Sequence, residues 1–121
     1  MTYRELVKRV QHYSGFSDQE SETALRLFVK NLAARLTPEE REDLASQLPG
    51  DLEQEALTSE VSNVKSADDF IQQFCIEEDI DEGRAKKQVM SAWRAIKEMV
   101  SPAELADIKA QLPNDLTGQL Y

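Results

Sequence analysis

The sequence is poor in the residues that most often carry chemistry: its 121 residues include one cysteine, one histidine and four glycines. The single Cys75 cannot form a disulfide within the chain and is typical of a reducing compartment. The few glycines form no Gly-rich loop that could hold a phosphate group. The sequence also lacks the HExxH pattern and the paired cysteines that bind metals. We therefore predict no catalytic residue, no cofactor and no metal.

His12 and Cys75 are the one combination that could act as base and nucleophile. The apolar pattern around His12 places this side chain on the solvent side of its helix, whereas Cys75 lies at the edge of an apolar stripe. A half-buried structural cysteine is therefore favoured over a Cys–His pair.

An acidic cluster, EEDIDEG at 77–83, invites comparison with a calcium-binding loop. The spacing does not fit, because Glu82 stands where a glycine would follow Asp81, and Gln88 stands where a closing glutamate is needed. These acids are better explained by the start of the next helix, where the helix dipole favours negative charge.

Long apolar runs and excess positive charge are also missing. No segment approaches the roughly 20 apolar residues that span a bilayer, and the residues after Met1 show no apolar core of the signal-peptide kind. The net charge is −9, of which residues 1–60 contribute −5 (7 Lys/Arg, 12 Asp/Glu) and residues 61–121 contribute −4 (7 against 11). Such a field repels phosphate backbones and anionic lipid. We expect a cytoplasmic protein that binds neither nucleic acid nor membranes.

What the sequence does contain is a repeat. Shifted by 64 positions, residues 3–57 align without a gap onto 67–121, and between 37–52 and 101–116 eight of sixteen positions are identical. The identical pairs are Pro38/Pro102, Glu40/Glu104, Asp43/Asp107, Gln47/Gln111, Leu48/Leu112, Pro49/Pro113, Asp51/Asp115 and Leu52/Leu116. Internal duplication explains this better than chance.

The apolar residues recur at helical spacing in both halves. The predicted core positions are Tyr3, Leu6, Val7, Val10, Leu25, Phe28, Val29, Leu32 and Leu36 in the first half, and Phe70, Ile71, Phe74, Val89, Trp93, Ile96 and Val100 in the second. Hydroxyl residues followed three positions later by an acid predict helix starts at Thr2, Ser17, Thr37, Ser66 and Ser101, and Asp81 is a further predicted cap.

These signals predict an all-α protein of two tandem, pseudo-equivalent four-helix halves packed into one compact helical domain. The first repeat covers 1–57, the linker 58–66 and the second repeat 67–121. The predicted helices span about 3–14, 18–36, 38–48, 51–57, 67–78, 82–100, 102–112 and 115–120.

The repeated motif itself is interpreted as a local signal that ends one helix and begins the next. Pro49 disfavours helical geometry at Leu48 and so ends a helix. Gly50 and its counterpart Asn114 tolerate the positive φ of a tight turn, and Asp51 can then cap a fourth helix.

The segment RLTPEEREDLASQLP at 35–49, with its weaker echo SPAELADIKAQLP at 101–113, resembles a family of uncharacterised bacterial proteins catalogued as domain of unknown function 2267. The resemblance covers nearly the whole chain. Arg35 is replaced by Met99 in the second half, so this basic position does not belong to both repeats. The resemblance implies an all-helical fold and supplies no activity, substrate or catalytic residue.

Several residues are candidates for contacts with a partner. Arg84, Lys87 and Arg94 form a basic stripe on the predicted solvent face of their helix. Leu27 and Ala34 lie opposite their own helix's core face, where either the other half of the chain or another subunit could cover them; we favour the other half.

Ile76 is a further candidate, because it takes the solvent-side position that His12 holds in the first half. With no convergent set of polar residues, a non-enzymatic acidic helical module that binds a protein partner or itself is the leading hypothesis. An enzyme or small-ligand binder with a pocket between the halves is the alternative.

Overall fold

The computed structural model describes residues 2–57 and 67–112, which form seven α-helices and no strand. The helices are α1 (Tyr3–Ser14), α2 (Asp18–Ala33), α3 (Pro38–Gln47), α4 (Gly50–Leu57), α5 (Ala67–Glu78), α6 (Glu82–Met99) and α7 (Pro102–Gln111). The prediction of an all-α fold is therefore confirmed for these residues. The predicted linker 58–66, the cap at Ser66 and the helix 115–120 lie outside the described residues.

Hydroxyl and carboxylate caps begin five of the helices, as predicted. The side chains of Thr2, Ser17, Thr37, Asp81 and Ser101 each accept the backbone N–H of the residue three positions on. In α3 and α7 a proline occupies the first helical position, where its missing N–H costs nothing. Because these signals are local, they predict where a helix starts without knowledge of the tertiary structure.

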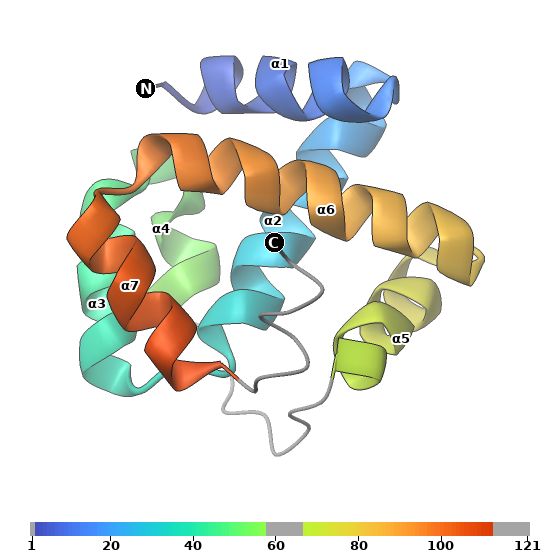
Figure 1. The fold of residues 1–121 in the computed structure, drawn as a ribbon. Coiled ribbons are helices and arrows are strands. Elements are labelled where there is room, and N and C mark those ends of the chain that lie inside the picture. Colours follow the sequence, from blue (N-terminus) through green and yellow to red (C-terminus); the bar gives the residue numbers. More distant parts are fainter. Residues whose placement is uncertain (1, 58–66, 113–121) are drawn as a thin grey trace.

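The helices pack around one core. In Figure 1, α1 lies across the top of the molecule over α6; it also contacts α2, and α6 packs against both α2 and α5. All the predicted core positions are buried. The Phe28 ring of α2 lies 5.6 Å from the Phe70 ring of α5 and 6.0 Å from the Trp93 ring of α6, measured between centroids. The aromatic centre of the core is thus shared by helices from both ends of the sequence.

Two details around the repeated motif correct the sequence-based interpretation. Gly50 is the first residue of α4 and does not have positive φ, and Asp51 lies inside the first turn instead of capping it. The Leu52 N–H bonds to the Pro49 carbonyl at 2.9 Å, so the helix starts earlier than predicted. Leu48 has the extended geometry that a following proline favours.

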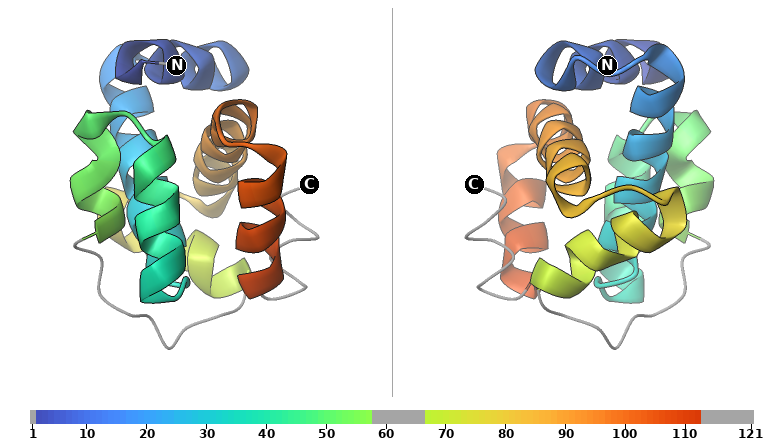
Figure 2. Two further views of the ribbon diagram at one scale, coloured as in Figure 1. Left: turned by 90° about the vertical axis from the view of Figure 1, so that its left-hand side faces the viewer. Right: turned by 90° about the vertical axis from the view of Figure 1, so that its right-hand side faces the viewer.

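The two copies of the repeated motif pack against each other through α3 and α7, a contact we call the α3–α7 seam. The Thr37 N–H donates to the side-chain oxygen of Gln111 (2.9 Å), and the Ser101 N–H donates to that of Gln47 (2.8 Å). Each helix therefore uses a glutamine near its end to bind the capped start of the other. Figure 2 shows α3 and α7 on the same side of the molecule, below α1.

Candidate functional site

The three predicted cations of α6 lie close to aromatic rings of the N-terminal segment. The guanidinium carbon of Arg84 is 4.5 Å from the Phe16 ring centroid, and that of Arg94 is 4.2 Å from the Tyr13 centroid. The Lys87 ammonium is 5.8 Å from the Phe16 centroid. Arg84, Lys87 and Arg94 are exposed, as predicted. Their charged groups nevertheless lie against aromatic rings. They cover the end of α1 and the turn that follows it, which the sequence pattern did not indicate.

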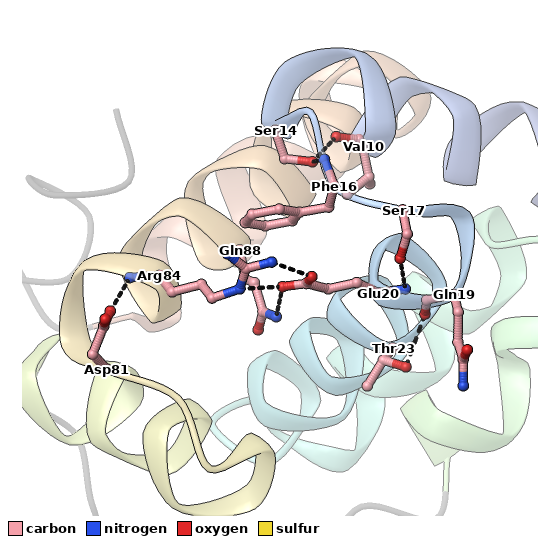
Figure 3. Close-up of polar contacts among 10 residues, drawn as sticks. All are labelled: Val10, Ser14, Phe16, Ser17, Gln19, Glu20, Thr23, Asp81, Arg84 and Gln88. Atoms are coloured by element: carbon pink, nitrogen blue, oxygen red, sulfur yellow. Dashed lines mark hydrogen bonds and ion pairs between the residues drawn. The ribbon is translucent and has the colours of Figure 1, made fainter.

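Glu20 of α2 and Arg84 and Gln88 of α6 form a second polar contact, which we call the α2–α6 junction (Figure 3). Arg84 holds the Glu20 carboxylate with two guanidinium N–H groups, one of which is Nε at 2.7 Å, and Gln88 Nε2 donates to the same carboxylate at 3.1 Å. These hydrogen bonds, with that from Arg84 first, hold the pKa of Glu20 below its ordinary value.

The junction borders a shallow hollow of about 310 Å³. Its walls are polar side chains and one isoleucine from both ends of the chain: Ser17, Gln19, Glu20, Thr23, Glu78, Ile80, Arg84 and Gln88. Burial raises the pKa of the Glu78 carboxyl, and the charges of Glu20 and Glu77 act in the same direction. Within the hollow, however, Glu20 and Arg84 already neutralise each other.

A larger basic surface lies between α1 and α6. Two neighbouring hollows, of about 420 and 680 Å³, share Tyr13 and Arg94 in their walls. We call the basic and apolar residues around them the basic cleft; they are Lys8, Arg9, His12, Tyr13, Lys87, Met90, Trp93, Arg94 and Lys97, and one acid, Glu5, and Ser91 complete the walls. Five of the 14 Lys and Arg residues of the chain thus line one surface of a protein whose net charge is −9.

Glu98 supports one side of this cleft. It accepts hydrogen bonds from Arg9 and from the Tyr13 hydroxyl, and so ties the end of α1 to α6. Lys8, Lys87, Arg94 and Lys97 of the cleft form no ion pair with another described residue. The cleft can therefore attract negative charge, with an aromatic ring at its centre.

The apolar candidates do not join this cleft. Leu27 is only 8 % exposed, in a small hollow bordered by Glu55 of α4 and by Glu77 and Glu78 of α5. The chain itself therefore covers most of Leu27, with residues of both halves at the border of the hollow, and cover by the other half stays a prediction. Ala34 is half-buried, and its carbonyl accepts a hydrogen bond from Arg41 at 3.4 Å. Ile76 is 72 % exposed on α5.

Among the described residues, one group of side chains comes together that could hold a metal ion. One carboxylate oxygen from each of Glu40, Asp43 and Glu104 lies within 4.8 Å of the others. Sequence reasoning missed this group because its members are up to 64 positions apart and it considered only ligands close in sequence. The identity of Glu40 and Glu104 in the repeat was the available signal.

These features describe an all-helical protein whose surface hollows are lined by charged and aromatic side chains. None of the helices described is both long and apolar enough to cross a bilayer. The model of the family described as "Uncharacterized conserved protein (DUF2267)" matches residues 3–118, so the chain belongs to this family, as the resemblance indicated. A search of curated proteins returned no match. The family description assigns no activity, and the site must be interpreted from its own chemistry.

Proposed function

We propose that the chain is one compact domain of two pseudo-equivalent repeats, 1–57 and 67–121, joined by the linker 58–66. The helix bounds support this: α1 and α5, and likewise α3 and α7, begin and end 64 positions apart, while α2 and α6 begin 64 apart. The backbone supports it too, because Gly15 (φ 76°) and Asp79 (φ 53°) are both left-handed and also 64 apart.

The contacts between the repeats follow the pattern expected of an approximate twofold axis. In such an interface, if residue i contacts residue j of the partner, then j contacts i, and residues on the axis meet their own equivalents. The paired Thr37–Gln111 and Ser101–Gln47 hydrogen bonds fit the first rule. The pairs 20/84 and 40/104 fit the second.

We propose further that this domain is a cytoplasmic protein-interaction module and not an enzyme, and that its basic cleft binds an acidic segment of a partner protein. The observation that carries this proposal is the gathering of Lys8, Lys87, Arg94 and Lys97 around Tyr13 on an otherwise acidic chain. The remaining surface repels nucleic acid and anionic membranes at long range, whereas a short acidic peptide needs only the cleft.

The cleft suits a peptide because it combines charge with apolar contact. Met90 is 39 % exposed beside Lys87 and Arg94, so an aliphatic or aromatic side chain of the peptide can pack there between its carboxylates. Arg94 is stacked on Tyr13 and is therefore already partly ordered, which lowers the entropy cost of binding.

Fluorescence anisotropy with a labelled Glu-rich peptide that contains one Leu tests the proposal. We expect salt-sensitive binding that weakens at least tenfold in the double variant Lys87→Glu, Arg94→Glu. The matched control is the double variant Lys86→Glu, Lys30→Glu, which makes the same change in net charge outside the cleft. Circular dichroism would verify that both variants fold.

Equal loss of binding in the two double variants would mean that net charge, not the cleft, attracts the peptide. Tighter binding of a single-stranded oligonucleotide than of the peptide would show that the partner class is wrong. If the unlabelled chain itself competes for the cleft, self-association replaces the partner protein as the function.

A small-ligand binder with a pocket between the halves is the second candidate. The polar lining of the hollow at the α2–α6 junction, drawn from both repeats, supports it, and Gln88 Oε1 there is buried without a hydrogen-bond partner in the part of the chain that the structure describes. We place it second because a charged ligand would have to displace the Glu20–Arg84 ion pair. A thermal-shift screen against small polar metabolites tests it: a hit whose effect disappears in Gln88→Ala would reverse the order.

A further inference from the structure

Two glutamates from opposite halves of the chain meet inside the α3–α7 seam. Glu40 is 7 % and Glu104 is 5 % exposed, although glutamate is rarely buried without a partner. The Oε1 atoms of both side chains are buried and have no hydrogen-bond partner among the described residues. Neither carboxyl group forms an ion pair within those residues. A buried acceptor without a donor is costly, so two such carboxyls in one contact are better suited to holding a positive group than to packing alone.

The neighbours of this pair increase the cost. The carboxyls of Glu40 and Glu104 lie within hydrogen-bonding reach of each other, and the charges of Asp43 and Asp107 also act on Glu104. A bound cation would attract each of these carboxylates and so offset their mutual repulsion.

We propose that the α3–α7 seam is a binding site for a divalent cation of the calcium type, with Glu40, Asp43 and Glu104 as its carboxylate ligands. The three oxygens come from two helices and lie within 4.8 Å of one another. Calcium binds oxygen at about 2.3–2.6 Å, so ligand oxygens of one calcium ion lie at most about 5.2 Å apart, a limit that this group satisfies.

The seam also provides access and support for an ion. Asp43 is exposed while the two glutamates are buried, so an ion can enter from the Asp43 side and keep water ligands there. The hydrogen bonds from Thr37 to Gln111 and from Ser101 to Gln47 hold the two helices together in the absence of an ion. The site therefore does not depend on the ion for its approximate geometry, and it is independent of the basic cleft.

Isothermal titration with CaCl₂, on protein first treated with chelator and at constant ionic strength, tests the proposal. We expect one calcium ion per chain, together with a higher unfolding temperature in calcium than in EGTA. Glu104→Gln should weaken calcium binding at least tenfold and remove the calcium-dependent rise in unfolding temperature. This variant is nearly isosteric and relieves a like-charge contact, so it should fold at least as well as the parent in EGTA.

Glu39→Gln is the matched control. It removes one exposed negative charge from the turn of α3 that also carries Glu40, and Glu39 lies outside the ligand group. It should bind calcium like the parent. No calcium binding by the parent, or equal binding by Glu104→Gln and Glu39→Gln, would overturn the site. Magnesium binding as tight as calcium binding would contradict the calcium assignment.

Discussion

Glu20 and Glu104 occupy the same position in their helices, three residues after a hydroxyl side chain that caps the first turn. Their surroundings are opposite. Arg84 and Gln88 donate to Glu20 and hold its pKa below the ordinary value, whereas burial and the Glu40 carboxyl raise the pKa of Glu104 to about 8. The capping pattern is therefore a guide to where a helix begins and not to the charge state of its acid.

The difference arises from the residue 64 positions away in each case. Position 84 carries an arginine opposite Glu20, so that contact is compensated. Position 104 repeats the glutamate of position 40, so the α3–α7 seam places like charges together. If the two halves are equivalent repeats, one contact has diverged into an ion pair while the other has kept its acids, and a retained buried acid pair suits a bound cation better than a structural contact.

The largest expected effect on the free energy of unfolding comes from the aromatic core. The effects expected at the α2–α6 junction and the α3–α7 seam can be compared with it. Trp93 is 1 % exposed and packs against Phe28. Trp93→Ala should lower the free energy of unfolding by about 3–5 kcal/mol, measured by urea denaturation. Met90→Ala, at an exposed position of the same helix, is the control and should change it little. A loss below about 1 kcal/mol for Trp93→Ala would show that the core is not shared as described.

The α3–α7 seam gives the next largest effect, of opposite sign. In divalent-free buffer at pH 9, Glu104→Gln should raise the free energy of unfolding by about 1–3 kcal/mol, because it removes a buried charge that lacks a partner. Glu39→Gln should leave it nearly unchanged. A clear loss of stability in Glu104→Gln would mean that the carboxylate is compensated by a group other than a cation.

The seam should also make stability depend on pH. Because the pKa of Glu104 is about 8 in the folded chain and about 4.5 when unfolded, the folded state holds the extra proton between these values. The free energy of unfolding should therefore fall as pH rises from about 4.5 to about 8, and this slope should be reduced in Glu104→Gln. Urea denaturation across this range measures it; identical slopes in parent and variant would remove the buried acid pair from the account.

The paired glutamines predict a smaller change. Gln111→Ala removes the acceptor of the Thr37 N–H and should cost about 0.5–1.5 kcal/mol, as should Gln47→Ala at the other end. The two effects should be similar, since the contacts are reciprocal. Gln54→Ala, on α4 away from the seam, serves as a reference. Markedly unequal costs for the two glutamine variants would argue against an approximate twofold arrangement.

The α2–α6 junction gives the smallest effect on stability, and this effect should be lost at acid pH. The pKa of Glu20 is lowered in the folded state, so its contribution is present above the unfolded value of about 4.5 and is lost as pH falls through the folded value. Glu20→Gln should therefore lower stability slightly at pH 7 and not at pH 2. A variant that is equally destabilised at both pH values would show a packing role instead of a charge role.

The sequence predicted the helices well because their signals are local. Caps at Ser17 and Thr37 and the proline after Leu48 act within one turn, and the structure has the starts and the stop where they were expected. Gly50 was misread because the Pro49 carbonyl receives a hydrogen bond from Leu52 and extends α4 backward.

The contacts between helices were not predicted, because no local signal specifies them. Leu27 was assigned to a second face without knowledge that α4 and α5 border it. Glu40 and Glu104 were interpreted only as parts of capping boxes, although their identity at a spacing of 64 was visible. In a duplicated chain, an acid repeated at the same position can meet its own copy, and this rule would have predicted the buried pair.

The central contrast can be measured directly by following the carboxyl carbons of Glu20 and Glu104 by NMR as a function of pH, in protein freed of divalent ions. The account predicts that Glu104 titrates well above the ordinary range, near pH 8, while Glu20 titrates below its ordinary value. Ordinary titration of both carboxyls near pH 4.5 would contradict it, because the two contacts would then be electrostatically alike.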